Sequence, residues 1–359
     1  MAEAEKVMGA SADDIEKIMG VSKDDIEKIM GVEIPSGVAW GGTRAVIMGG
    51  RVMYNSSVDV STTAIQYKSI TSDGNTSDFG NLTVQRHAAK GAGSNVTRAL
   101  MASGGSDTGG SFTWNDTIDY VTVGSTGNAS DFGNVDNDMG YGGRDGASNG
   151  TLCFLNGGND GTLNDDMEYI TIASTGNGTD AGDLTQGKNS QATSNADTKY
   201  LIVGGYSGSG YALTEVDTHS FHTSNNATDY GNVSSFAVYN TGIASSQTRV
   251  VCAGGFTATG SWTRGNEIHY FPVASSADST DAANMTTINA GSSGTSDATR
   301  GEFYGGQDHN AFFLNRIQKI TIASISDAED IGDLSDNING SNSQGEVNMN
   351  MSASSQTGT

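Results

Sequence analysis

Short runs of alternating apolar and polar residues recur along the chain from residue 40 to residue 352. The most regular run has the form Ile-x-Tyr-x-x-Ile, with related residues in several copies, and it occurs six times. Alternation with a period of two puts successive side chains on opposite faces of a strand, so each run predicts a β-strand. The six runs cover residues 65–70, 118–123, 167–172, 216–221, 268–273 and 317–322.

A second motif, Asp-aromatic-Gly or a close variant, begins eight residues after the end of each run. Four residues beyond its Asp stands an apolar residue, which predicts a buried anchor. Because the spacing never varies, we expect the linking turn to have one geometry throughout. The six Asp residues and their apolar partners are Asp78 with Leu82, Asp131 with Val135, Asp180 with Leu184, Asp229 with Val233, Asp281 with Met285 and Asp330 with Leu334.

A third motif is a short apolar strand that ends in Gly-Gly and usually begins with a basic residue. Paired glycines allow positive φ and a close approach of backbones, as expected where strands crowd near an axis. The copies span residues 44–50, 98–105, 152–158, 199–205, 249–255 and 300–306, and a degenerate seventh copy without the glycines spans 345–351.

These three motifs define a repeat of about 45 to 55 residues, the length of a β-propeller blade. Residues 37–359 are therefore predicted to form an all-β domain of six blades, with seven blades including one partial blade as the alternative. We expect the strands at 44–50 and 345–351 to pair, because this pairing closes the ring and removes the open sheet edges.

The Gly-Gly strand followed by a strand carrying Tyr resembles the kelch repeat over residues 40–352, although the Trp of that repeat is absent. The phrases at 125–135 and 174–185 also resemble repeats in structural proteins of marine bacteriophages. The kelch resemblance implies a propeller. The phage resemblance implies a virion protein, assembled in the host cytoplasm, that acts as a decoration, fibre or host-recognition module.

Residues 5–34 carry an unrelated repeat with a period of eleven, Glu-Lys-(Val/Ile)-Met-Gly. Ser and Asp before each unit and Gly after it are typical of helix ends, so the sequence predicts a short helical N-terminal arm over residues 1–36. Such helices need a surface to cover. That surface is this propeller, another copy, or a larger assembly to which the arm is anchored; similar repeats at the front of phage virion proteins favour the assembly. The side chains expected to make the contact are Ile15, Ile18, Met19, Ile26, Ile29 and Met30.

The charge restricts the range of partners. The 359 residues include 41 Asp and Glu against 18 Lys and Arg, a formal net charge of −23. Such a surface repels phosphate backbones and anionic membranes, so we expect neither nucleic acid nor a membrane as a partner. Calcium in Asp-rich loops remains an alternative, with the Asp residues of the second motif as candidate ligands: Asp78, Asp131, Asp180 and Asp229. The competing interpretation is that these carboxylates accept hydrogen bonds from nearby backbone N–H groups.

The sequence offers little catalytic chemistry. The 5 His residues are scattered over the repeats without metal-ligand spacing, and no nucleophile motif or phosphate-binding loop is visible. Arg residues recur at strand starts, as structural partners do, and the two Cys lie in non-adjacent repeats, which predicts free thiols. We therefore expect a protein that is not an enzyme and carries no cofactor.

The loops after Gly-Gly vary most and carry aromatic residues, so they are the candidate binding surface for a host glycan or protein. The competing interpretation is that these rings belong to the blade cores. Two further functions stay open: a carbohydrate-binding or carbohydrate-active extracellular propeller, and an intracellular kelch-type scaffold. The candidate residues are Phe112, Trp114, Tyr206, Tyr211, Phe256, Trp262, Phe312 and Phe313.

Overall fold

The computed structural model describes the propeller region over residues 44–55, 58–87, 90–95, 97–107, 112–136, 145–196, 199–208, 212–221, 225–234, 241–258, 262–297, 299–310, 313–335 and 350–353. In the arm it describes residues 6–7, 10–11, 17–18, 21–22, 28–29 and 32–33.

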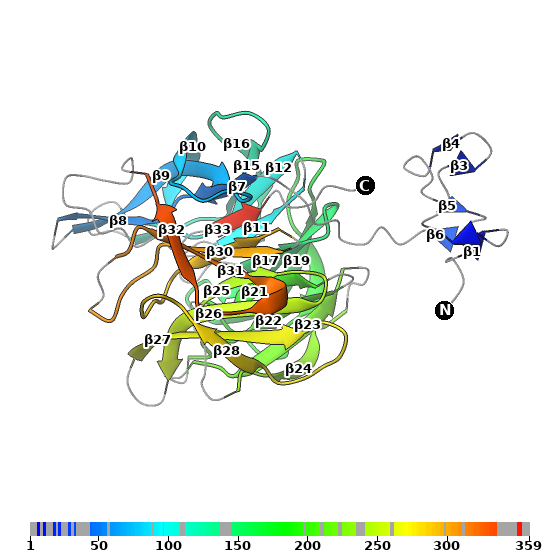
Figure 1. Cartoon of the computed structure of the whole chain (residues 1–359). Coiled ribbons are helices and arrows are strands. Elements are labelled where there is room, and N and C mark those ends of the chain that lie inside the picture. The colour runs from blue at the N-terminus through cyan, green and yellow to red at the C-terminus, as the bar shows by residue number, and fades with distance from the viewer. Residues whose placement is uncertain are drawn as a thin grey trace.

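Six antiparallel sheets form the blades of a closed β-propeller (Figure 1). From the innermost strand outwards, blade I contains β33 (Asn350–Ala353), β7 (Arg44–Met48), β9 (Val58–Ser69) and β10 (Ser77–Arg86). Blade II contains β11 (Lys90–Ser94), β12 (Arg98–Ala102), β15 (Thr117–Thr122) and β16 (Ser130–Asn134). Blade III contains β17 (Asp145–Ser148), β18 (Leu152–Asn159), β19 (Leu163–Thr171) and β20 (Thr179–Asp183).

The remaining blades repeat this order. Blade IV contains β21 (Ala192–Ala196), β22 (Lys199–Val203), β23 (Glu215–Ser220) and β24 (Thr228–Asn232). Blade V contains β25 (Gly242–Ser245), β26 (Arg249–Ala258), β27 (Trp262–Pro272) and β28 (Thr280–Asn284). Blade VI contains β29 (Ser293–Ser296), β30 (Arg300–Tyr304), β31 (Arg316–Thr321) and β32 (Glu329–Asp333), with a 3₁₀ turn, η3 (Ile322–Ser324), after β31.

The three sequence motifs correspond to the second, third and fourth strands of each blade. The apolar second strands are buried on both faces, because each blade packs between two neighbours. The anchors that follow the second motif are all buried, as predicted. The cores therefore lie between blades, where residues such as Val46, Phe79 and Val121 of blades I and II form one cluster.

The first strand of each blade is the one that the sequence motifs do not mark. These innermost strands consist mainly of Gly, Ala, Ser and Thr, and each contacts the next around the ring, from β11 through β33 and back to β11. A Cβ added to Gly294 would lie 2.1 Å from the carbonyl oxygen of Ile243 in the next strand. Larger side chains would thus push the blades apart at the axis.

The chain closes the ring as expected, by pairing its two ends. β33 lies antiparallel to β7, with Asn350 opposite Met48 and Ala353 opposite Ala45. The assignment of residues 345–351 as a seventh Gly-Gly strand is wrong, because β33 is the missing innermost strand of blade I. The propeller therefore has six blades.

The Gly-Gly pairs adopt positive φ, at +67° in Gly49 and +118° in Gly50. A Cβ on Gly49 would lie 2.8 Å from the carbonyl oxygen of Arg86, so the close approach is to the loop leaving β10. In blade II the pair is Ser103-Gly104 rather than Gly104-Gly105, and Ser103 has a φ of +56°.

Alternate blades differ in how their second and third strands are connected. β8 (Arg51–Asn55) extends the hairpin of blade I, and the hairpins of blades III and V are likewise continuous ladders. Blade II instead carries a separate hairpin of β13 (Gly105–Asp107) and β14 (Phe112–Trp114). Isolated bridges tie blades II, IV and VI to the loop that enters them; these bridges are His87 to Gly105, Asn189 to Tyr206 and Ala290 to Gln307. The ring thus consists of three similar two-blade units.

The helices predicted for the arm are wrong where the described residues test them. Three antiparallel pairs occur instead: β1 (Lys6–Val7) with β2 (Ala10–Ser11), β3 (Lys17–Ile18) with β4 (Val21–Ser22), and β5 (Lys28–Ile29) with β6 (Val32–Glu33). The Gly taken as a helix stop stands in sequence between the paired segments, and Gly favours short hairpin connections as well as helix ends.

Candidate functional site

The antiparallel order of each blade gives the ring two different faces. We call the face that carries the connections between second and third strands the hairpin face. The opposite face, which carries the connections between third and fourth strands, we call the turn face. Equivalent connections emerge on the same face, because all six blades have the same strand order. The aromatic loops proposed from sequence lie on the hairpin face.

The turn face fastens neighbouring blades together. At every interface, a backbone N–H just after the second motif donates to a side-chain oxygen in the next blade's turn, at 2.9–3.2 Å. The accepting residues are Asn128, Asn177, Asn226, Asp278, Asp327 and Asn75. This repeated bond explains why the spacing between the first and second motifs is constant.

A second layer of fastening uses one buried polar side chain in the third strand of each blade. These side chains are Gln66, Asp119, Glu168, Asp217, His269 and Gln318, all at most 2 % exposed. Most of them accept from the residue that follows the apolar anchor of the preceding blade, as Asp119 does from the Thr83 hydroxyl at 2.6 Å. A buried cation also reaches two of them, in the pairs Arg86–Asp119 and Lys188–Asp217, both at 2.7 Å.

The basic residues that begin the second strands have a structural role, as the sequence indicated. The guanidinium of Arg98 lies 4.7 Å from the ring centre of Tyr120 in its own blade. The same group donates to the carbonyl oxygen of Ile172 in the next blade at 2.8 Å. Arg44 and Arg249 make equivalent contacts.

Three of the predicted aromatic residues, Trp114, Tyr206 and Phe256, are half-buried on the hairpin face, and they come from three different blades. Trp114 reaches across to blade III, where a Cβ added to Gly161 would lie 3.0 Å from its Cη2 atom. Because Gly161 has no side chain, the indole edge rests against backbone. This contact supports the indole of Trp114 and leaves part of it exposed.

Phe256 is held by a cation. The guanidinium of Arg264 lies 4.7 Å from its ring centre, and Arg264 also donates to Gln307 of blade VI at 2.9 Å. The phenyl ring of Phe256 is thereby fixed on the hairpin face between blades V and VI. Phe256 is therefore held by Arg264 of its own blade, which bonds blade VI, whereas Trp114 packs directly against blade III.

Phe313 is not a surface residue, and the prediction that it belongs to the binding surface is wrong. Its side chain is 4 % exposed, and its backbone pairs with Gln307. The competing blade-core interpretation holds for this residue. Tyr211 and Phe312 lie outside the described residues, as do the side chains of Phe112 and Trp262, whose backbones belong to β14 and β27.

Most of the anchoring residues proposed for the arm also lie outside the described part of the chain. Ile15, Met19, Ile26 and Met30 lie outside the described residues. Ile18 and Ile29 lie in β3 and β5, whose pairing replaces the helices on which the anchoring surface was predicted.

The Asp residues weighed as calcium ligands are used in local turns. A carboxylate oxygen of Asp131 accepts from the N–H of Gly133 at 3.1 Å, and one of Asp180 accepts from Gly182 at 2.9 Å. These are the backbone-bonding turns expected from the alternative interpretation. Asp78 and Asp229 occupy the equivalent exposed positions of blades I and IV.

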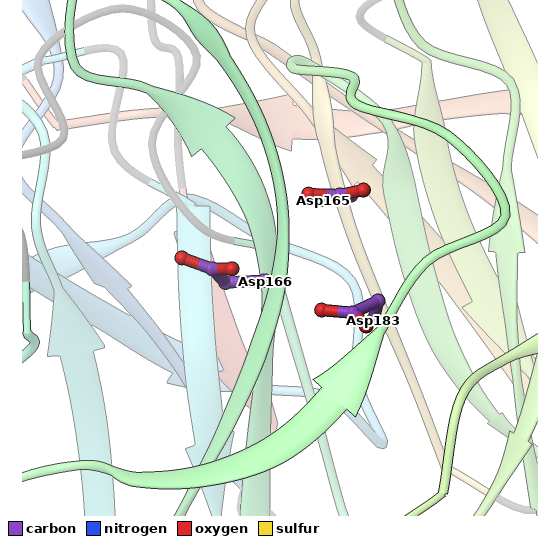
Figure 2. Close-up of side chains that lie close together, drawn as sticks. All are labelled: Asp165, Asp166 and Asp183. Carbon is purple, nitrogen blue, oxygen red and sulfur yellow. The ribbon is translucent and has the colours of Figure 1, made fainter.

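One group of carboxylates does come together in the described part of the chain (Figure 2). Carboxylate oxygens of Asp165, Asp166 and Asp183 lie within 4.8 Å of one another. Asp166 in β19 stands opposite Asp183 in β20, which explains their proximity. No sequence motif indicates this group, because its members belong to two different motifs. Oxygen ligands of this kind suit hard divalent cations.

Both thiols and three of the four described histidines are internal, whereas His309 is exposed. His219 and His269 are at most 4 % exposed, and burial lowers the pKa of each. Cys153 and Cys252 are buried and form no disulfide, as expected, and burial raises the pKa of the Cys252 thiol to about 12. Protonated at neutral pH, Cys252 is a poor nucleophile.

No family model and no curated protein matches the chain. Within the described residues, no helix is long and apolar enough to cross a membrane.

Proposed function

We propose that this protein is a display and binding module rather than an enzyme, and that its hairpin face holds the partner. The observation that carries the proposal is the difference between the two faces. The turn face repeats one set of bonds at all six blade interfaces and is thereby committed to holding the ring together. The hairpin face varies from blade to blade and presents Trp114, Tyr206 and Phe256 partly exposed.

The finer proposal is a virion structural protein that serves as a decoration, fibre or host-recognition module. It is supported by the resemblance of the turn phrases and of the eleven-residue repeats to phage proteins. In this account residues 1–36 attach the propeller to other virion proteins. The net charge of −23 favours a partner that is not a polyanion.

Deletion of residues 1–36 tests the attachment. The truncated chain is expected to keep the thermal unfolding midpoint of the full chain and to be lost from purified particles. A matched control replaces residues 1–36 with a Gly/Ser linker of the same length, so that loss of sequence is separated from loss of length. Incorporation of the truncated chain at the normal level would refute the attachment.

The hairpin face is tested by binding of host-surface glycans to an array. The full chain is expected to bind, and the double variant Trp114→Ala/Trp262→Ala to bind at least about tenfold more weakly, because aromatic anchors dominate recognition surfaces. Phe313→Leu serves as the control, since that ring is buried. Equal binding by the double variant and the full chain would exclude these rings as anchors.

A carbohydrate-active propeller is the second candidate, favoured by the carboxylates of Asp165, Asp166 and Asp183 near the same face. Release of reducing ends from a polysaccharide by the full chain, lost in Asp166→Asn, would favour it over simple display. Turnover that persists at a normal rate in Asp166→Asn would exclude this group as the reactive site.

A further inference from the structure

Each interface between blades contains one pair of facing side chains at equivalent positions. One member is the third residue of the second strand, and the other lies on the third strand of the next blade. Four of the six pairs are apolar, and a fifth joins Phe154 to His219 with ring centres 5.2 Å apart. The four apolar pairs are Val46 with Val121, Leu100 with Ile170, Leu201 with Phe271 and Val251 with Ile320.

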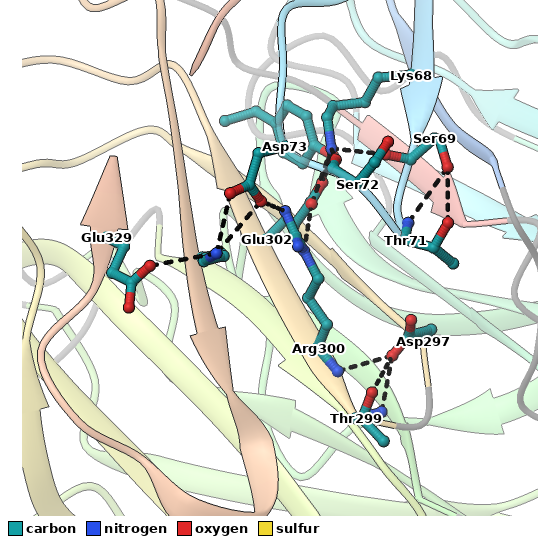
Figure 3. Close-up of polar contacts among 12 residues, drawn as sticks. Lys68, Ser69, Thr71, Ser72, Asp73, Asp297, Thr299, Arg300, Glu302 and Glu329 are labelled. Carbon is teal, nitrogen blue, oxygen red and sulfur yellow. Dashed lines mark hydrogen bonds and ion pairs between the residues drawn. The ribbon is translucent and has the colours of Figure 1, made fainter. Parts of the chain in front are cut away.

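The sixth pair, where blade VI closes on blade I, is ionic. The ammonium of Lys68 lies 2.8 Å from one carboxylate oxygen of Glu302 and 2.9 Å from the other, and the two side chains are 3 % and 0 % exposed. Lys68 also donates to the carbonyl oxygens of Ser69 and Ser72. All the donor positions of this ammonium are thus used (Figure 3).

The carboxylate of Glu302 also has hydrogen-bond donors besides Lys68. It accepts from Nε of Arg300 at 2.6 Å and from the hydroxyl of Tyr304. Arg300 in turn donates to Asp73 of blade I at 2.7 Å, and Lys319 lies 3.1 Å from the same carboxylate. A chain of charges therefore runs from the buried pair to the surface. Its links Lys68–Glu302, Arg300–Asp73 and Lys319–Asp73 each join blade VI to blade I (Figure 3).

A buried ion pair contributes little net stability over a packed apolar pair, but a single buried charge without its partner is strongly destabilising. If blade VI packed against any blade other than I, Glu302 would face an apolar residue or His219. If Lys68 faced any blade other than VI, it would meet Val46, Leu100 or one of their counterparts. An apolar pair at this position carries no such charge penalty. Buried ion pairs at other positions, Arg86–Asp119 between blades I and II and Lys188–Asp217 between blades III and IV, mark two further interfaces.

We propose that the Lys68–Glu302 pair specifies ring closure: it makes blade VI pack on blade I of the same ring and excludes other blade pairings during folding. Six blades built on one pattern have many ways to pair wrongly, within one chain or between two. The ionic interface lies where the chain's two ends meet, which is the contact that forms between the segments most distant in sequence.

Replacing the ionic pair by an apolar pair tests this directly. The triple variant Lys68→Ile/Glu302→Val/Tyr304→Phe copies the pair between blades V and VI and removes the Tyr hydroxyl that would lose its acceptor. We expect the variant to keep an unfolding midpoint at or above that of the wild type. Refolded from denaturant at rising protein concentration, it should give at least about threefold less monomer than the wild type, with the remainder in oligomers.

The control Val251→Ile/Ile320→Val exchanges the apolar pair of blades V and VI and should refold to monomer as the wild type does. If the triple variant also refolds to monomer with wild-type yield at every concentration, the pair does not specify closure. A lowered midpoint with an undiminished monomer yield would assign it a purely stabilising role and would equally overturn the proposal.

A second variant decides the matter should the triple variant fail to fold. Val251→Glu/Ile320→Lys, made in the otherwise unchanged chain, gives the interface of blades V and VI the same ionic pair, with Arg249 placed as Arg300 is. Two interfaces then carry the same ionic pair, so the pair no longer distinguishes blade I from blade VI as a packing partner. The monomer yield is therefore expected to fall. Wild-type monomer yield from this folded variant would contradict the proposal.

Discussion

Glycines at the second motif set how closely neighbouring blades approach. A Cβ added to Gly80 would lie 2.3 Å from the carbonyl oxygen of Gly127 in the next blade, and Gly133 has the same relation to Gly176. Both glycines also have φ near +150°. Blade V carries Ala283 at this position, opposite a turn of different sequence. The requirement for Gly therefore goes with the positive φ of this position, which Ala283 does not adopt.

Gly133→Ala is expected to lower the free energy of unfolding by about 2–4 kcal/mol, because the added carbon collides with backbone and the φ of +148° is strained for Ala. Chemical denaturation measures the change. Ala283→Gly, the matched control at the equivalent position, should change stability by no more than about 1 kcal/mol. A loss no larger in Gly133→Ala than in the control would contradict the proposed close approach.

His219 gives the ring a pH dependence. Its side chain is 4 % exposed between the rings of Phe154 and Tyr200, and burial lowers its pKa. A base with a lowered folded pKa contributes full stability above its unfolded pKa, about 6.5, and loses it as the pH falls from there towards the folded pKa. His269, whose pKa is also lowered by burial, acts in the same direction.

The variant His219→Phe, which carries the residue found at the equivalent position of blade V, should remove part of this dependence. The difference in unfolding free energy between variant and wild type is expected to be constant above pH 7 and to grow in favour of the variant below about pH 6.5. Denaturation curves at pH 7.5, 6.5 and 5.5 provide the measurement. Parallel pH profiles for the two proteins would refute the assignment.

At the scale of strands, the sequence predicts what has a strong apolar pattern and misses what does not. The second and third strands of every blade follow from their motifs, because Val, Ile and Tyr alternate or run together there. The fourth strands, such as Thr179–Asp183, carry the Asp-aromatic-Gly motif, which the sequence indicated only as a turn with a buried anchor. The innermost strands, such as Ser293–Ser296, consist mainly of small residues that carry no strand signal, and a Cβ added to Gly294 would lie 2.1 Å from the carbonyl oxygen of Ile243. Pairing with the second strand of the same blade, not their own propensity, makes them strands.

The aromatic residues of the hairpin face and the bonds between blades were predictable to different degrees. Phe313 and Trp114 stand in similar sequence surroundings, yet one is in the core and the other at the rim, and only tertiary packing separates them. The buried polar residue in the third strand was visible in sequence as a polar residue beside Ile or Val. Its partner lies in the preceding blade, which no local pattern reveals. The prediction of helices in the arm was wrong because Gly after Met occurs at helix ends and in hairpin connections alike.

β33 closes the ring through its pairing with β7, and its removal has a defined cost. A chain ending at residue 349 leaves the inner edge of β7 without a partner. We expect the loss of several kcal/mol in unfolding free energy, at about 1 kcal/mol for each backbone hydrogen bond, together with aggregation through the open edge. Chemical denaturation and size-exclusion chromatography measure both effects. Wild-type stability in the truncated chain would show that β33 is dispensable for closure.

At the scale of the whole molecule, the six blades are fastened in the same way on one face but alternate on the other. Bridges such as Asn189 to Tyr206 recur only at every second interface among the described residues, so the hairpin face has an approximate threefold pattern. The turn face has an approximate sixfold pattern. A rigid ring with one uniform and one variable face suits a molecule that holds its shape while its loops recognise a partner.

The central claim is that the two ends of the chain pair to close six blades into one ring, and engineered disulfides test it most directly. Two double variants, Ala45→Cys/Ala353→Cys and Val46→Cys/Ser352→Cys, place thiols at positions directly opposite in the register of β7 and β33. Since opposed pairs alternate between hydrogen-bonded and non-hydrogen-bonded sites, one of the two should suit a disulfide. Mild oxidation is expected to produce the intramolecular crosslink in monomeric protein, detected by peptide mass and faster migration on a non-reducing gel. Failure of both variants to form it, or crosslinks only between chains, would contradict the closed ring.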